Sequence, residues 1–101
     1  MKEFNEIIKE SRPTLVDFYA TWCGPCRHQL PIIDMVKAEY GDRTNVIKID
    51  VDKDRELVSQ YRIQSIPTIV VFKSGEVVWR ASGLQSYDKL MSVLNLMSGS
   101  D

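Results

Sequence analysis

The sequence predicts an α/β fold in which helices flank both faces of a mixed β-sheet. Helical and strand patterns alternate in the order helix, strand, helix, strand, helix, strand, strand, helix. Strand–helix–strand units call for parallel strands, and a short turn between the last two strands adds an antiparallel pair. Because no repeat or linker interrupts the 101 residues, we expect a single domain over residues 1–101.

Each predicted strand is a short run rich in β-branched or aromatic residues. The first run reads as buried on both faces, although one acid, Asp17, lies in its middle. The segment Lys73-Ser74-Gly75-Glu76 has the composition of a hairpin turn between the third and fourth strands. The four strands are expected at residues 15–20, 46–51, 68–72 and 77–79.

Each predicted helix places apolar residues at steps of three and four, on one face. The longest begins at the cysteines and continues until Gly41, and Pro31 inside it is expected to cause a kink. Either Asp52 or Asp54 caps the third helix, and Ser86 caps the last. The helices are expected at residues 2–11, from the cysteines to residue 40, around residues 57–61, and over residues 87–97.

Composition argues against several classes of function. The chain has 13 basic and 14 acidic residues and a net charge of −1, which disfavours binding to nucleic acids or membrane surfaces. No apolar run approaches the roughly 20 residues of a membrane-spanning helix, and the N-terminus lacks the apolar segment of a signal peptide. We therefore expect an intact, monomeric, cytoplasmic protein; removal of upstream residues before this chain was made is the alternative.

The chain contains two cysteines, Cys23 and Cys26, three residues apart. A disulfide that closes so short a loop adds little stability. A zinc site needs four ligands, and the nearby His28 would supply only a third, so no metal is expected. Two inert core cysteines are a further alternative, which the flanking tryptophan, glycine and proline disfavour. The favoured interpretation is a redox-active disulfide with no bound cofactor.

The predicted position of Cys23 favours a nucleophilic role. It directly precedes a long helix, so its sulfur is expected at the helix N-terminus, where unpaired N–H groups and the helix dipole stabilise a thiolate. Pro25 suits the first helical turn. Cys26 lies one turn along on the same face, where it can resolve the mixed disulfide that attack by Cys23 forms.

Asp17 is the second unusual feature. A carboxylate within an apolar strand is costly unless it is paired or protonated, and burial raises its pKa. It is either a proton acceptor and donor for Cys26, directly or through water, or an acid that points from a strand edge into water. Lys48 in the neighbouring strand is either its charge partner or an ordinary solvated lysine.

Two further residues are open to more than one interpretation. Trp22 belongs either to the core or to a substrate-contacting surface beside the nucleophile. Pro67 opens the third strand, and the local pattern by itself favours a trans bond before it.

These residues resemble the thioredoxin family over almost the whole chain. A bare Cys-x-x-Cys pair would be weak evidence, but Trp-Cys-Gly-Pro-Cys at residues 22–26 with a distant Ile66-Pro67-Thr68 is highly specific. The matching positions are 16–26, Pro31, 48–52, 66–68, Phe72, Gly75 and Gly83.

The resemblance implies a thioredoxin fold and the activity of a protein-disulfide reductase. Cys23 would be the exposed nucleophile and Cys26 the buried resolving thiol, with Asp17 as the proton-transfer carboxylate and Lys48 near it. The Ile66–Pro67 bond would be cis, and its backbone would pair with an extended substrate. Thioredoxin reductase, a flavoprotein, would supply electrons from NADPH. The implied substrate-binding residues are Trp22, Gly24, Pro25, Ile66, Pro67 and Gly83.

The chain departs from the family pattern at two places. Tyr19 stands where the family commonly has tryptophan, and the first helix begins almost at Met1, where relatives usually have a strand. We therefore expect four strands flanked by four helices, with an exposed edge on the strand at residues 46–51. Such an edge invites pairing with another chain.

Two other activities are compatible with this fold. Related oxidases and isomerases tend to carry histidine between the cysteines, which makes the disulfide more oxidising, whereas Gly24 and Pro25 supply no such charge. A non-enzymatic scaffold or subunit would not need both cysteines. The reductase interpretation is therefore favoured.

Overall fold

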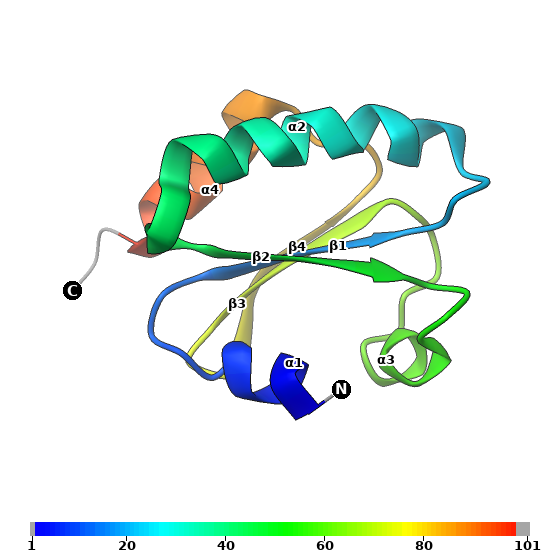
Figure 1. The fold of residues 1–101 in the computed structure, drawn as a ribbon, viewed down its shortest axis with the longest axis horizontal. Helices are drawn as coiled ribbons and strands as arrows, with labels where there is room; N and C mark the ends of the chain where they lie inside the picture. Colours follow the sequence, from blue (N-terminus) through cyan, green and yellow to red (C-terminus); the bar gives the residue numbers. More distant parts are fainter. Residues whose placement is uncertain (1, 99–101) are drawn as a thin grey trace.

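A four-stranded mixed sheet lies between two layers of helices (Figure 1). The computed structural model describes residues 2–98. The strand order is β2-β1-β3-β4, with β1 parallel to β2 and antiparallel to β3, and β3 antiparallel to β4. The strands are β1 (Thr14–Tyr19), β2 (Asn45–Asp50), β3 (Thr68–Lys73) and β4 (Glu76–Ser82).

The helices cover opposite faces of the sheet. In Figure 1, α2 and α4 lie on one face and α1 and α3 on the other. None of the helices within residues 2–98 is long and apolar enough to cross a membrane. The helices are α1 (Lys2–Ile7), α2 (Gly24–Tyr40), α3 (Arg55–Gln60) and α4 (Tyr87–Ser98), and a 3-10 turn, η1 (Gly41–Arg43), follows α2.

The predicted order of elements and their turn signals are confirmed. Asp54 accepts a hydrogen bond from the Leu57 N–H at 3.3 Å, and Ser86 accepts one from the Lys89 N–H at 3.1 Å, so both act as helix caps. The hairpin turn between β3 and β4 has positive φ at Ser74 (55°) and Gly75 (85°), as two-residue hairpin turns often require.

Two predicted boundaries are wrong by three residues or more, the end of the first helix and the end of β4. The helix α2 continues through Pro31 to Tyr40. The first helix ends at Ile7 rather than residue 11, because the N–H groups of Lys9 and Glu10 bond to carbonyls three residues back, as in a tighter 3-10 turn. β4 continues three residues beyond Trp79 because Arg80, Ala81 and Ser82 pair with β3. These residues have weak strand propensity, so pairing decides their conformation.

The two faces of β1 join two separate cores. Val16 and Phe18 pack with α1 and α3 residues, whereas Leu15 packs with Ile33 and Val36 of α2. Because alternate residues of a strand face opposite sides, Asp17 lies on the same face as Leu15, which α2 covers. The acid is therefore directed into the layer between the sheet and the helix that carries the cysteines.

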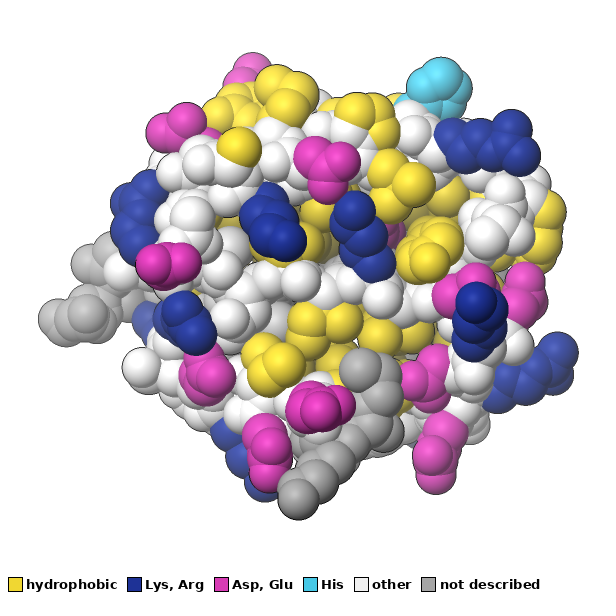
Figure 2. Space-filling view, in the orientation of Figure 1, with side chains coloured by type: hydrophobic (Ala, Val, Ile, Leu, Met, Phe, Trp, Pro, Cys, Tyr) yellow, Lys and Arg dark blue, Asp and Glu magenta, His cyan; other side chains and the backbone are white. Residues whose placement is uncertain are grey.

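The outer edge of β2 is open among the described residues, as predicted. Asn45 and Val51 donate their N–H groups to Pro13 and Tyr19, each at 2.9 Å. The direction of the backbone N–H groups alternates along a strand. The N–H groups of Ile47 and Ile49 therefore also face β1, whereas those of Val46 and Lys48 face outwards. Figure 2, in the orientation of Figure 1, shows hydrophobic side chains above and below the open edge of β2.

This alternation predicts a hydrogen-exchange pattern along β2. The amides of Ile47 and Ile49 should exchange at least about tenfold more slowly than those of Val46 and Lys48, because only the former are bonded within the sheet. Amide exchange followed by NMR measures the four rates. Equal protection of all four amides would contradict an open edge and would mean that another chain covers it.

Candidate active site

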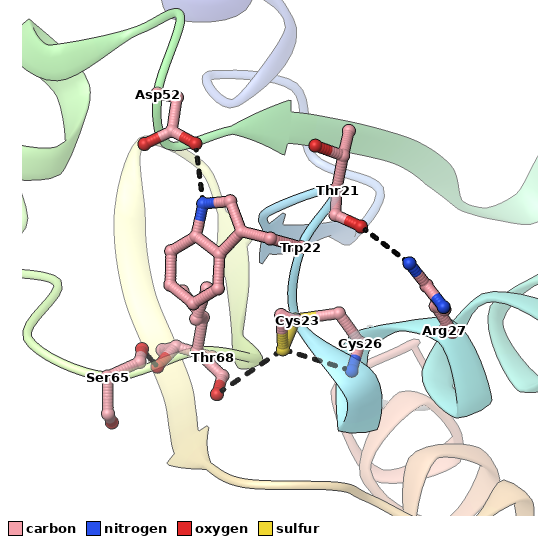
Figure 3. Close-up of a disulfide and its surroundings, with 9 residues drawn as sticks. Thr21, Trp22, Cys23, Cys26, Arg27, Asp52, Ser65 and Thr68 are labelled. Atoms are coloured by element: carbon pink, nitrogen blue, oxygen red, sulfur yellow. Dashed lines mark hydrogen bonds between the residues drawn. A yellow bond between two sulfur atoms is a disulfide. The ribbon is translucent and has the colours of Figure 1, made fainter.

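The two cysteines lie at the N-terminus of α2, just after β1 ends (Figure 3). Cys23 is the N-cap of α2 with an extended backbone (φ −91°, ψ 118°), and its sulfur accepts a hydrogen bond from the Cys26 N–H at 3.2 Å. The cysteines form a disulfide with their Cα atoms 5.2 Å apart. Pro25 occupies the first turn of α2, where its missing N–H costs no helical hydrogen bond.

This geometry favours negative charge on the Cys23 sulfur once the disulfide is reduced. A helix N-terminus presents unpaired N–H groups, and the dipoles of 17 residues of α2 are aligned behind it. The Cys26 N–H already points at the sulfur. A thiolate is the attacking species in disulfide exchange, so the predicted placement at a helix start is confirmed and has a direct chemical use.

The expectation of an exposed Cys23 is wrong for the disulfide form. Cys23 is 5% exposed and Cys26 is 1% exposed. Both pack with Ala20, and the side chains of Tyr19, Val51 and Ile66 lie against this cluster. Cys23 keeps the larger accessible surface of the two.

The loop before β3 faces the disulfide. The Ile66–Pro67 bond is cis, which confirms what the resemblance implied and corrects the local pattern, which favours trans. The Cys23 sulfur lies 3.9 Å from the Ile66 carbonyl oxygen. The Gly83 N–H donates to the Pro67 carbonyl at 2.8 Å, so the segment after β4 lies beside this loop.

Trp22 is a surface residue, not a core residue. It is 67% exposed, and its indole N–H donates to the Asp52 carboxylate at 2.8 Å (Figure 3). A cavity of about 350 Å³ lies beside it. Apolar side chains, including those of Val58 and Ile63 near α3, form much of its wall, with Arg55 among the polar lining residues. The sequence analysis missed Asp52 as the partner that orients Trp22.

Asp17 is fully buried, so the interpretation that it points into water is wrong. No protein group within residues 2–98 hydrogen-bonds to either carboxylate oxygen. Burial raises the pKa of Asp17 to about 6, and the positive charge of Lys48 opposes this shift. The site therefore contains a carboxyl group that can exchange a proton near neutral pH.

Lys48 lies near one buried acid and one exposed acid. It pairs with Asp17 in the register of β1 and β2, yet its ammonium nitrogen lies 3.1 Å from a carboxylate oxygen of Asp34, on the surface of α2. Its side chain is 38% exposed. Lys48 is thus a partly solvated lysine in an ion pair with Asp34, and it acts on Asp17 only through its charge.

Gln29 is a buried polar residue that the sequence analysis missed. It is fully buried on the face of α2 that carries Cys26, and its side-chain amide bonds to the backbone of Gln85 at 2.8 and 3.0 Å. A glutamine within the apolar stripe of a helix was the available signal, since a buried amide needs partners. Among residues 2–98, no group of three or more histidine, cysteine, aspartate or glutamate side chains is placed to hold a metal ion.

Comparisons with known proteins agree with this geometry. The family model described as Thioredoxin matches residues 1–96. A thioredoxin-like protein of Synechocystis is 45% identical over 94 residues, 92% of this chain and 90% of that protein. The thioredoxin of Rickettsia prowazekii is 42% identical over 91 residues, 90% of this chain and 87% of that protein. A solved mutant thioredoxin from Halobacterium salinarum has a TM-score of 0.87 at 34% identity, and the match covers 97% and 85% of the two chains.

The buried carboxyl of Asp17 predicts a gain in stability on removal of its charge. The pKa of about 6 lies above the ordinary value of 3.8, so the folded state retains a proton that the unfolded chain releases between these values. The free energy of unfolding therefore falls as pH rises through this window. At pH 7 the buried charge lowers the free energy of unfolding by up to about 3 kcal/mol. Asp17→Asn should remove this loss, and urea unfolding at pH 4 and pH 7 would measure the difference.

The comparison of the wild type with Asp17→Asn isolates the titration of Asp17, because all other carboxyl groups are the same in both proteins. Wild type and variant should differ in stability far more at pH 7 than at pH 4. A difference that does not change with pH would contradict a buried, titrating Asp17.

Proposed function

The chain belongs to the thioredoxin family, which makes it a thiol–disulfide oxidoreductase, and we propose that it reduces disulfides in client proteins. The observation that carries the proposal is the Cys23 sulfur held as the N-cap of α2, with Cys26 bonded to it and the Ile66 carbonyl opposite. Gly24 and Pro25 place no charged side chain between the sulfurs, which supports a reductase over an oxidase.

The reaction proceeds by two exchanges of sulfur. The Cys23 thiolate attacks one sulfur of the client disulfide, a new S–S bond forms, and the other client sulfur leaves as a thiolate that takes up a proton. Cys26 then loses its proton and attacks Cys23, so that the client leaves as a dithiol and Cys23–Cys26 becomes the disulfide seen here. The client gains two electrons from the two cysteines and two protons, one from Cys26 and one from the solvent that took up the Cys23 proton on ionisation.

We assign Asp17 as the group that accepts the proton of Cys26. It lies on the sheet face beneath α2, and its pKa of about 6 leaves it mostly ionised at pH 7 but able to accept a proton. Lys48 supports this role because its charge keeps the pKa of Asp17 from rising further.

Clients dock, in this proposal, across the surface around Cys23. The cis loop at Ile66 and Pro67 offers backbone groups to an extended peptide, Gly83 lies beside it, and exposed Trp22 offers an apolar face. The cavity of about 350 Å³ next to Trp22 suits an apolar client side chain. Gly24 and Pro25 leave the approach to the sulfur free of long side chains.

Electrons come, in the same proposal, from NADPH through the flavoprotein thioredoxin reductase, the usual partner of this family. A role in electron transport and cell redox homeostasis follows. Residues 1–101 as a single domain, the monomeric state and the cytoplasmic location remain predictions. One relative, 40% identical over 89 residues, is a chloroplastic thioredoxin of rice.

Reduction of insulin tests the proposed function. With NADPH and thioredoxin reductase, the protein should reduce insulin disulfides catalytically, measured as NADPH consumption and insulin precipitation. Absence of turnover with the intact dithiol would favour a non-enzymatic scaffold.

Two cysteine variants serve as matched controls in this assay. Cys23→Ser should abolish turnover, because no attacking thiolate remains. Cys26→Ser should trap clients as mixed disulfides, visible on a non-reducing gel, because the resolving thiol is absent. If both variants trapped clients equally, the assigned roles would be wrong.

Asp17→Asn should slow resolution of the mixed disulfide at pH 7 by at least about tenfold, because general-base catalysis by a positioned group is lost. In the wild type, the rate should rise with pH through about 6, where Asp17 ionises. Rapid-mixing measurements of client thiol release follow both effects. Asp34→Asn, which removes the surface acid bound to Lys48, is the control and should leave this pH profile in place.

A further inference from the structure

A chain of hydrogen bonds joins the dithiol helix to the loops that face it. Gln29 lies one turn beyond Cys26 on α2 and is fully buried. Its amide nitrogen donates to the Gln85 carbonyl at 3.0 Å, and its amide oxygen accepts from the Gln85 N–H at 2.8 Å. One side chain thus occupies both backbone groups of a residue 56 positions away.

Gln85 continues the chain towards the docking surface. Its side-chain amide donates to the carbonyls of Ser82 at 3.3 Å and Gly83 at 3.1 Å. The Gly83 N–H in turn donates to the Pro67 carbonyl at 2.8 Å. The neighbouring Ile66 carbonyl lies 3.9 Å from the Cys23 sulfur, so the chain runs from the helix that carries the cysteines to the loop that faces them.

The loop at residues 83–86 has few apolar anchors of its own, although β4 before it pairs with β3 and Ser86 caps α4 after it. Gly83 has no side chain, adopts a positive φ of 90°, and would place an added Cβ in open space. Leu84, the apolar residue of the loop, is 49% exposed and so is not held in the core. Within this loop, the side-chain hydrogen bonds to α2 come from Gln29, and Gln85 uses its own side chain to hold the backbone of Ser82 and Gly83.

We propose that Gln29 and Gln85 form a clamp that sets the distance between the dithiol and the client-docking loops, so that they are positioning residues for protein clients. The inference rests on the proposed function. A docked peptide must present its disulfide in line with Cys23, and displacement of the docking backbone by about 1 Å can cost two orders of magnitude in rate. Small disulfides, which need no backbone docking, do not depend on the clamp.

Gln29→Met tests the clamp, because methionine keeps an unbranched side chain of similar length and removes both bonds to Gln85. The kcat/KM for insulin should fall about tenfold, because the docked peptide no longer presents its disulfide in line with Cys23. The rate with a small disulfide, hydroxyethyl disulfide, should stay within about twofold of the wild type. Gln60→Met, at an exposed position on α3, is the matched control and should change neither value.

Gln85→Ala provides a second variant if Gln29→Met fails to fold, since Gln85 is partly exposed and its backbone bonds remain. It should also lower the kcat/KM for insulin. An unchanged kcat/KM for insulin, or equal losses with insulin and hydroxyethyl disulfide, would overturn the clamp. A wild type that reduces hydroxyethyl disulfide but not insulin would overturn the proposed function itself.

Discussion

The hydrogen bond from the Cys26 N–H to the Cys23 sulfur is the interaction on which the rest of the site depends. It begins α2 and, in the same geometry, directs helix N–H groups at the sulfur that must carry negative charge. Folding of the helix therefore creates the reactive group. The apolar residues Ile33, Val36 and Tyr40 hold α2 on the sheet, so the core stabilises the site from one side.

Asp17 is the part of the site that lowers the stability of the fold. β1, like β3, has neighbouring strands on both sides, and helices cover both faces of the sheet, so an acid in the middle of β1 is buried. Local rules would place an apolar residue there. Real proteins tend to break such rules at functional positions, and here the exception lies beneath the helix of the dithiol.

The docking side of the site is assembled from segments far apart in the chain. Ile66 lies 43 positions from Cys23, and Asp52, which orients Trp22, lies 30 positions from it. The Gln29–Gln85 pair spans 56 positions.

The amino-acid sequence by itself determined the features that depend on near neighbours. Spacing of three and four placed the helices, Ser86 capped the last one, Ser74 and Gly75 made the turn, and a Cys-x-x-Cys pair before a helix gave the redox site. Only the tertiary structure decided the low exposure of Cys23, the partners of Trp22 and Gln29, and the full length of β4. The physical reason is that these depend on contacts between distant segments, which no local period or cap encodes.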